Sequence, residues 1–277
     1  MRARLSCIDL CGGDKMNTYI QFAAIKFRNN MAYRFEYLMG ILNTVLNFIV
    51  YCCIYKALYG GANEVDGITF SMVTTNFIIS LGLTNAFSKN EMFLQDKIKQ
   101  GTIANELLKP VNFKFRMLFE DMGDGLFKVI FNFIPAVLIA MVFTQIQPPA
   151  GILNFTLCLV SAVLGYIVLW YISFIVQTWS FWLFSVWGIV TIKNVIINIC
   201  SGALLPLWFM PEPIMNIIRF TPFDSIFFTP VQLYLGNLQG CEILFNFARQ
   251  LLWIVILYFA GEFFWRRGIK KLVVQGG

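Results

Sequence analysis

The stretch KNEMFLQDKIKQGTIANELLKPVNFKFRMLFEDMGD, residues 89–124, is the one long polar interruption in an otherwise apolar chain. Long apolar runs flank it on both sides, and charged residues are spread through its whole length. Such a segment does not enter a lipid bilayer, because charged side chains are costly in hydrocarbon. We therefore expect it to lie in water, held there by the rest of the chain.

The polar stretch also carries signals for helices and turns. Residues 87–99 read as a polar continuation of the preceding apolar helix, and Gly101 is suited to end that helix because glycine tolerates a left-handed backbone. Residues 102–109 follow as a short turn or helix that Pro110 stops, and residues 112–121 form a second amphipathic pattern. These signals predict a compact helical elbow, either a solvated loop with interfacial lysines or, as we favour, a docking surface for a partner.

The composition is that of a membrane protein. The chain has 277 residues, of which 58% are hydrophobic and only 13% charged, against about 25% charged in ordinary soluble domains. Histidine is absent, and the seven cysteines have no metal-type spacing, so neither a metal site nor a disulfide framework is expected. Residues 1–15 lack the apolar stretch of a secretory signal. No nucleic-acid partner is expected.

The apolar runs predict an all-α polytopic membrane protein with six transmembrane helices and cytoplasmic termini. An amphipathic helix at residues 16–34 is expected to lie in the headgroup layer, within an N-terminal region of residues 1–35. The transmembrane domain takes residues 36–265, and a basic tail takes residues 266–277. Pro135 predicts a kink in the third span. The spans are expected at residues 37–58, 68–88, 125–145, 152–176, 189–209 and 243–265.

Two apolar regions need further interpretation. Residues 152–209 contain a single charge, Lys193, and are long enough for two crossings but not for three with their turns. The turn between these spans is expected within residues 177–188, where tryptophans mix with polar side chains. Residues 206–240 are interrupted by five prolines, which predicts short outer helices that enter one leaflet and return.

Basic residues gather on one face of this predicted topology. Of the 21 Lys and Arg residues, six lie in the first 34 residues, seven in residues 89–128 and four in the tail. The positive-inside rule places that face, with the elbow and both termini, in the cytoplasm.

Residues that could perform catalysis are scarce. The sequence has no GxxxxGK[ST] phosphate loop, and without histidine it has no Ser/His or Cys/His pair, so the chain is not expected to hydrolyse ATP itself. No carboxylate falls in the middle of a predicted span, which disfavours an ion-coupled secondary carrier. A membrane-embedded lipid-modifying enzyme would depend on Glu120, Asp121 and Asp124, which an ordinary acidic helix end explains equally well.

Uncharged polar side chains recur at helical spacing in two predicted spans. Asn43 and Asn47 are four residues apart in the first, and Asn194, Asn198 and Ser201 follow one another in the fifth. Taken singly, each is better explained by hydrogen bonding between helices. As two aligned sets, they are the best candidates for lining a path for an amphipathic substrate.

Three stretches carry a resemblance to a known family: IKQGTIANELLKPV at residues 98–111, SGALLPLWFMP at residues 201–211 with Pro-Phe at residues 222–223, and the terminal Gly-Gly. With six spans and an elbow between the second and third, the chain resembles the permease subunit of a bacterial type-2 ABC exporter.

The resemblance implies a permease of the bacterial inner membrane, paired with a second copy or a paralogous permease and with two separate ABC ATPase subunits. ATP and Mg²⁺ would bind to those ATPase subunits, and this chain would bind no cofactor. The first and fifth spans would surround a route for an amphipathic or hydrophobic substrate, which alternating access would open to each side in turn. The elbow, around residues 97–110, would be the coupling helix seated in an ATPase cleft, contributing Lys97, Gly101, Thr102, Asn105, Glu106, Leu108, Lys109 and Pro110.

Overall fold

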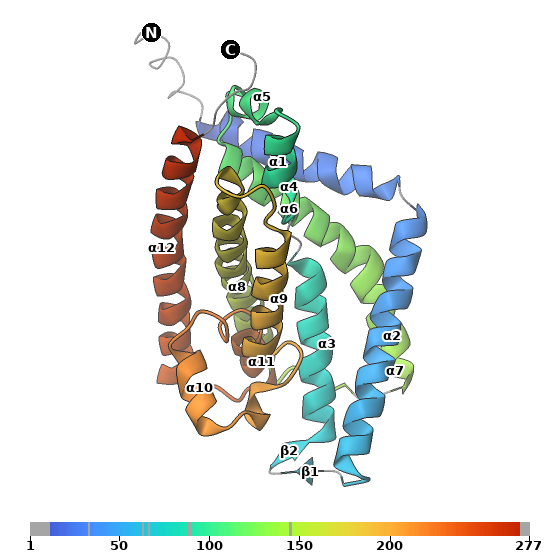
Figure 1. Ribbon diagram of the computed structural model, residues 1–277. Helices are drawn as coiled ribbons and strands as arrows, with labels where there is room; N and C mark the ends of the chain where they lie inside the picture. The colour runs from blue at the N-terminus through green and yellow to red at the C-terminus, as the bar shows by residue number, and fades with distance from the viewer. Residues whose placement is uncertain are drawn as a thin grey trace.

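The computed structural model describes residues 12–32, 34–62, 64–65, 67–87, 90–143 and 146–271, and nearly all of them are helical or in short turns. Six helical stretches run side by side along one axis, while α1 lies across one end of the bundle (Figure 1). The six are α2 (Arg34–Tyr59), α3 (Phe70–Ala86), the continuous run of α6 (Phe113–Lys128), the π turn η1 (Val129–Phe133) and α7 (Ile134–Phe143), then α8 (Ile152–Thr178), α9 (Trp187–Cys200) and α12 (Cys241–Lys270).

Four of these stretches are long and apolar enough to cross a membrane, namely Leu38–Tyr59, Phe113–Met141, Ile152–Phe181 and Cys241–Lys270. Their apolar side chains are largely exposed on the protein surface, as a lipid environment requires. The helices α3 and α9 have only 17 and 14 residues. At 1.5 Å per residue they reach about 25 and 21 Å, short of the roughly 30 Å hydrocarbon core. The all-α polytopic class is therefore confirmed, and the count of six spans stays a prediction.

The predicted fifth span, residues 189–209, is wrong in its second half. Helix α9 ends at Cys200 and the chain then turns, with Gly202 in a left-handed conformation at φ 78°. A side chain at this glycine would also press on Leu207 and Phe228, whose atoms lie 3.2–3.3 Å from an added Cβ. The short 3-10 turn η3 (Leu207–Phe209) follows. The run is apolar throughout, so hydropathy alone could not reveal this break.

Two further boundaries differ from the sequence prediction. Residues 87–99 are not one continued helix, because α3 ends at Ala86 and α4 begins at Phe93. Phe87, directly after α3, is buried, with its ring stacked 5.3 Å from that of Phe227. The second amphipathic helix and the third span are in turn one continuous helix from Phe113 onward.

The bend predicted at Pro135 is accompanied by the π turn η1 directly before it. Proline has no N–H to complete the helical pattern, and a wider turn relieves the mismatch. Asn132 in this turn contacts Gly40 of α2 so closely that an added Cβ would lie 2.5 Å from its Nδ2 atom. The π turn therefore fixes the approach of α2 to the third helical stretch.

Helix α1 (Gly12–Met31) confirms a helix within the predicted interfacial segment, and it packs on α6. The carbonyl oxygen of Ala23 would lie 2.2 Å from a Cβ added to Gly123, so the two backbones touch directly. The rings of Phe27 and Phe127 add an edge contact at 5.6 Å. On α1, Ile20 and Met31 remain about half exposed, leaving an apolar stripe away from the protein.

The opposite end of the bundle carries the hairpin β1 (Glu64–Val65) and β2 (Ile68–Thr69), and short helices α10 (Glu212–Arg219) and α11 (Phe228–Leu235) (Figure 1). Short helices in residues 206–240 were expected from the prolines; their insertion into one leaflet stays a prediction.

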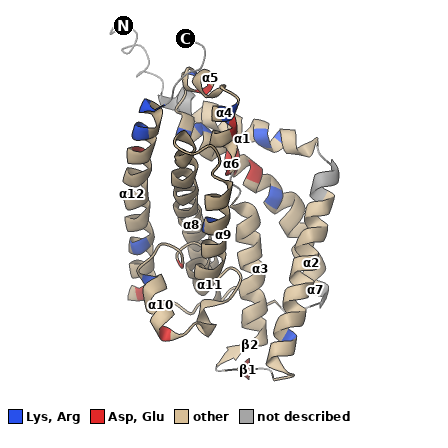
Figure 2. Cartoon of the chain, viewed as in Figure 1, with Lys and Arg blue, Asp and Glu red and all other residues tan. Residues whose placement is uncertain are grey.

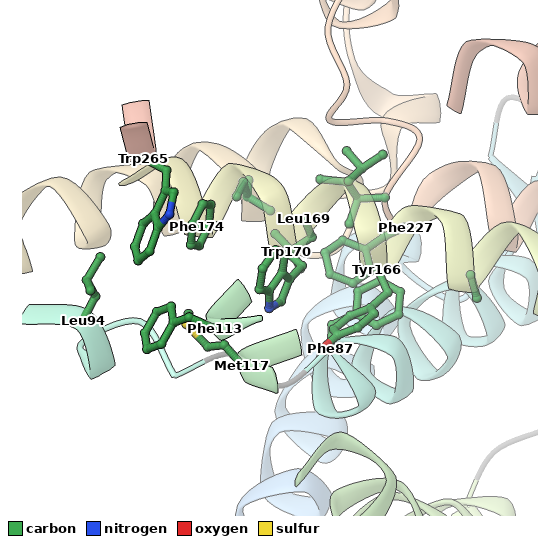
Figure 3. Close-up of a cluster of buried hydrophobic side chains, with 14 of the residues drawn as sticks. Phe87, Leu94, Phe113, Met117, Tyr166, Leu169, Trp170, Phe174, Phe227 and Trp265 are labelled. Atoms are coloured by element: carbon green, nitrogen blue, oxygen red, sulfur yellow. The ribbon is translucent and has the colours of Figure 1, made fainter. Parts of the chain in front are cut away.

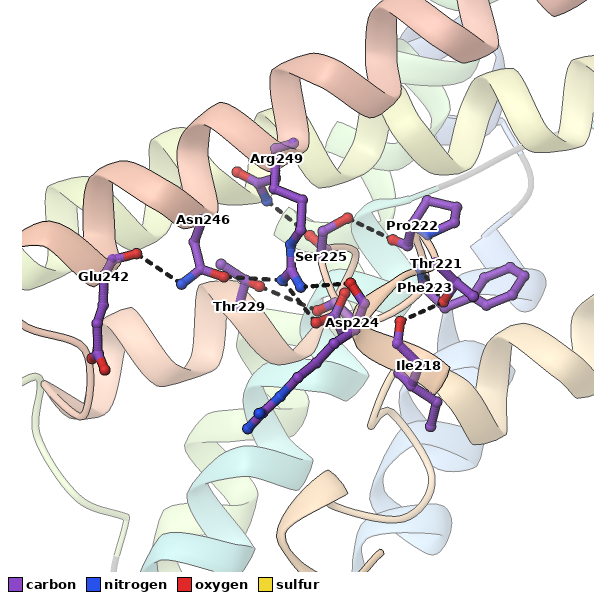
Figure 4. Close-up of polar contacts among 12 residues, drawn as sticks. Ile218, Thr221, Pro222, Phe223, Asp224, Ser225, Thr229, Glu242, Asn246 and Arg249 are labelled. Carbon is purple, nitrogen blue, oxygen red and sulfur yellow. Dashed lines mark hydrogen bonds and ion pairs between the residues drawn. The ribbon is translucent and has the colours of Figure 1, made fainter. Parts of the chain in front are cut away.

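This outer segment is tied to α12 by polar contacts. Arg249 forms an ion pair with Asp224 at 2.7 Å and also bonds Asn246, while Gln250 donates to the carbonyl of Ser225 at 2.8 Å (Figure 4). All of these groups are buried or half-buried, so the outer segment is anchored rather than loosely attached.

The main core lies toward the other end of the bundle, where buried aromatic side chains of α6, α8 and α12 meet (Figure 3). Phe113 of α6 stacks on Trp265 of α12 with ring centroids 5.3 Å apart, and Trp170 stacks on Phe174 within α8 at 5.2 Å. The indole N–H of Trp170 donates to Asp121 at 3.0 Å. This core joins the base of the elbow to α8 and α12.

Candidate functional site

The elbow projects from the end of the bundle where α1 lies and α12 finishes (Figure 1). It consists of α4 (Phe93–Lys99), α5 (Ile103–Leu107) and the start of α6. As predicted, Gly101 follows the end of α4 and has a left-handed φ of 68°. The Thr102 N–H then donates to the Lys97 carbonyl at 3.0 Å, closing a tight connection into α5.

Glu106 is the electrostatic centre of the elbow. Its carboxylate lies 2.5 Å from Arg116, 2.7 Å from Lys109 and 3.5 Å from Lys97. Burial by itself would raise the pKa of Glu106, but the hydrogen bonds from Lys109 and Arg116 outweigh it and lower the pKa to about 2. Arg116 is itself buried and also pairs with Glu120 at 3.0 Å. One carboxylate thus ties α4, α5 and α6 together.

The eight predicted coupling residues separate into two groups. The first group builds the elbow from within and is only partly exposed: Lys97, Thr102 and Glu106. The second group is exposed at the tip: Gly101, Asn105, Leu108, Lys109 and Pro110. Leu108 is 82% exposed, although leucine is normally buried. Charged residues concentrate at this end of the molecule (Figure 2), so the tip offers one bare apolar side chain within a charged surround. A docking role for these residues stays a prediction.

The turn between α8 and α9, with the 3-10 turn η2 (Trp179–Phe181), supports the elbow from the side. It lies within the predicted residues 177–188. The buried N–H of Val186 donates to the Gln95 amide of α4 at 2.7 Å. The Lys99 ammonium lies 4.6 Å from the ring centroid of Phe184, at cation–π distance. The elbow is therefore bonded to the start of α9.

A second link between the elbow and α9 was missed from the sequence. Glu91, just before α4, forms an ion pair with Lys193 in α9 and accepts a hydrogen bond from Asn194 at 2.8 Å. Lys193 also donates to Ser173 of α8 at 3.0 Å. Lys193 is the single charge in a 58-residue apolar run, and a buried charge requires a partner. From the sequence alone, this requirement indicates that Lys193 has an acidic partner, but it does not identify which acid.

The predicted pathway residues are not gathered at one place in the chain. Asn43 and Asn47 lie exposed on α2, where the Asn47 amide donates to the Asn43 side chain at 3.1 Å. Asn198 is exposed on α9, whereas Asn194 is engaged by Glu91. Ser201 is fully buried, and its hydroxyl has no hydrogen-bond partner within the described part of the chain. Figure 1 shows α3 between α2 and α9, so the two predicted sets do not lie on neighbouring helices of this chain.

The three acids that a lipid-modifying enzyme would need are occupied by structural contacts. Glu120 pairs with Arg116 at 3.0 Å, and Asp121 accepts the Trp170 indole N–H. Asp124 pairs with Lys128 at 2.7 Å and accepts from the Asn30 amide at 2.6 Å. These contacts engage all three acids, within α6 and with α1 and α8, and give the enzyme alternative no support.

Comparison with known families agrees with this architecture. The family model described as ABC-2 family transporter protein matches residues 41–276, from within α2 to beyond α12. The chain therefore belongs to the ABC-2 family of transporter proteins. Membership makes it a membrane transport subunit, a permease that works with ABC ATPase subunits. No curated protein sequence matches this chain.

Proposed function

We propose that this chain is the permease subunit of an ATP-driven exporter in the bacterial inner membrane, with six spans and both termini in the cytoplasm. It pairs with a second copy or a paralogous permease, and two ABC ATPase subunits, which bind ATP and Mg²⁺, drive it. The substrate is amphipathic or hydrophobic, because the bundle offers apolar walls with few polar side chains.

The elbow carries this proposal. It presents Leu108 and its exposed neighbours to an ATPase cleft, while the Glu106 ion pairs make it a rigid unit. The Glu91–Lys193 pair and the Gln95–Val186 hydrogen bond connect that unit to α9. Movement of the ATPase subunits is thereby transmitted to one of the two helices that carry the pathway candidates.

The substrate route forms where α2 and α9 meet their counterparts in the second permease. Each contributes exposed amides, Asn43 and Asn47 from α2 and Asn198 from α9, with Asn194 and Ser201 deeper. Exposed leucines and isoleucines on α2 and exposed isoleucines on α9 provide the apolar contact surface of the pair. ATP binding closes the ATPase dimer, draws the elbows together and favours the outward-open arrangement.

Site-directed labelling tests the orientation on which the coupling scheme depends. Single cysteines replace Asn105 at the elbow tip and, as the matched control, Glu64 in the hairpin, in a chain whose seven cysteines are serines. A membrane-impermeant maleimide is expected to label Glu64→Cys in intact cells and Asn105→Cys only in inverted vesicles. The ATPase subunit should then protect or cross-link Asn105→Cys. The reverse labelling pattern would contradict the proposal.

A further inference from the structure

An open groove of about 630 Å³ lies between the η2 turn and the last turns of α12. This volume is within the range of about 300–1,000 Å³ typical of small-molecule sites. One wall is formed by Trp179, Trp182 and Leu183, and Phe264 completes the apolar part. The other wall is basic, with Arg267, Lys270 and Lys271. The groove is at the same end of the bundle as the elbow but is formed by other residues.

The apolar wall is unusually bare for a surface in water. Trp179, Trp182 and Leu183 are 43%, 39% and 40% exposed. Tryptophan is enriched where a membrane meets water, because its ring is apolar and its N–H is polar. The wall is also held at a fixed spacing from α12, since a Cβ added to Gly268 would lie 2.2 Å from the ring of Phe181. The groove is therefore a built feature of the fold.

The basic wall is available to an anion. Lys270 and Lys271 are exposed at the end of α12, and no ion pair joins either of them to a carboxylate within the described ranges. The nearby Glu262 is already engaged, by Lys114 and by Arg266. Arg267 packs its guanidinium 4.2 Å from the Phe263 ring centroid. Among the described residues that line the groove, three positive charges thus face an apolar wall and no carboxylate balances them.

We propose that this groove binds an anionic phospholipid, with the phosphate headgroup on Arg267, Lys270 and Lys271 and an acyl chain along Trp179, Trp182 and Leu183. Charge complementarity selects the headgroup, since each basic side chain near a membrane surface adds to the attraction for an anionic lipid. The apolar wall selects a chain-bearing ligand over a free phosphate. The proposed membrane orientation decides only which leaflet supplies the lipid. The binding test requires neither transport nor ATP hydrolysis.

Native mass spectrometry of the full-length chain in detergent measures the binding, with phosphatidylglycerol and phosphatidylcholine as probes. Phosphatidylglycerol is expected to bind at least tenfold more tightly than phosphatidylcholine. The variant R267Q/K270Q/K271Q should lose this preference. The control variant K26Q/R28Q removes basic side chains from α1, at the same end of the bundle but outside the groove, and should keep most of it. Equal losses in both variants would show diffuse charge attraction and overturn the groove site.

Three further measurements separate other occupants from the lipid. A phosphatidylglycerol with a photoreactive acyl chain should cross-link to the peptide containing Trp182 and Leu183, and cross-linking elsewhere alone would contradict the site. Millimolar inorganic phosphate should not compete, because competition would indicate a free-anion site. A chain ending at Lys271 should bind the lipid as the full chain does. Binding seen only after this truncation would make residues 272–277 the occupant and refute the proposal.

Discussion

The guanidinium of Arg116, at the start of α6, lies 2.5 Å from the carboxylate of Glu106 in α5, and both side chains are largely shielded from water. This pair connects the first turns of α6, a helix of the bundle, to α5, which we propose contacts the ATPase subunit. A load applied to α5 therefore reaches α6 through a charge-assisted hydrogen bond as well as through the connecting loop.

Replacing Glu106 with glutamine is expected to loosen the elbow while leaving membrane insertion intact. The change leaves Arg116 with Glu120 alone and should lower the free energy of unfolding by about 1–3 kcal/mol. Thermal unfolding and hydrogen exchange of residues 93–109 measure the effect. Glu64→Gln makes the same change on an exposed strand and should stay within about 0.5 kcal/mol of the unaltered chain. Equal behaviour of the two variants would contradict the central role of Glu106.

The same carboxylate gives the elbow a defined acid sensitivity. The pKa of Glu106 is lowered to about 2 in the folded protein, against roughly 4.3 for an unperturbed glutamate. Because the folded pKa is the lower one, the stabilisation is complete above about pH 4.3 and is lost as the pH falls towards 2. Hydrogen exchange in α5, corrected for intrinsic rates, should therefore accelerate over this interval. Glu106→Gln should lack this component, and an identical pH profile in both proteins would refute it.

Leu108 at the elbow tip is expected to be a binding determinant without being a folding determinant. Leu108→Ala should weaken binding of the ATPase subunit by about tenfold, because central apolar contacts of an interface typically contribute more than 1 kcal/mol. The unfolding temperature should not change, since this side chain is 82% exposed. Leu58, 70% exposed near the hairpin, supplies the matched Leu58→Ala control. Affinity measured in nanodiscs distinguishes the two variants, and equal affinities would remove Leu108 from the interface.

The Glu91–Lys193 pair is expected to show strong coupling in a double-mutant cycle. Glu91→Gln or Lys193→Met alone leaves a buried charge and should lower the free energy of unfolding by about 3–5 kcal/mol. The double variant should lose much less than the sum of the two. Lys128→Met, which breaks the more exposed pair with Asp124, should lower it by about 1 kcal/mol or less. Additive losses at Glu91 and Lys193 would show that the pair does not link the elbow to α9.

The contact of α1 with α6 predicts opposite effects for two glycine-to-alanine changes. Gly123→Ala places a methyl group against the Ala23 backbone and should lower the free energy of unfolding by about 1–3 kcal/mol. Gly188→Ala lies in α9 with open space around the new methyl group, and it should raise stability by up to about 1 kcal/mol. Thermal unfolding of both variants measures the difference. Similar effects would mean that α1 does not pack closely in solution.

The sequence was sufficient for features that depend on composition over many residues. It predicted the all-α membrane class, the turn after α8 and the left-handed Gly101. The short helices among the outer prolines also agree with the structure. It could not predict where an apolar helix stops for reasons of packing, as at Gly202, since hydropathy is the same on both sides of that break.

Contacts between residues far apart in the chain were the second feature that the sequence could not predict. The long apolar run around Lys193 showed that this lysine needs an acid, but Glu91 is 102 residues away and only the folded chain brings the two together. Glu106 was likewise predicted as a coupling residue, which stays a prediction, but its ion pairs with Lys109 and Arg116 inside the elbow were not foreseen. Residues of the same type and spacing can bind a partner protein or stabilise the elbow itself, and only the contacts in the folded chain distinguish these two roles.

The backbone contact between Ala23 and Gly123 has a mechanical consequence. Helix α1, which is predicted to lie on the bilayer surface, is in direct backbone contact with the helix that continues from the elbow. If α6 tilts during a transport cycle, α1 must move with it and displace the neighbouring lipid headgroups. The free-energy cost of each conformational change then depends on the thickness and lateral tension of the surrounding membrane.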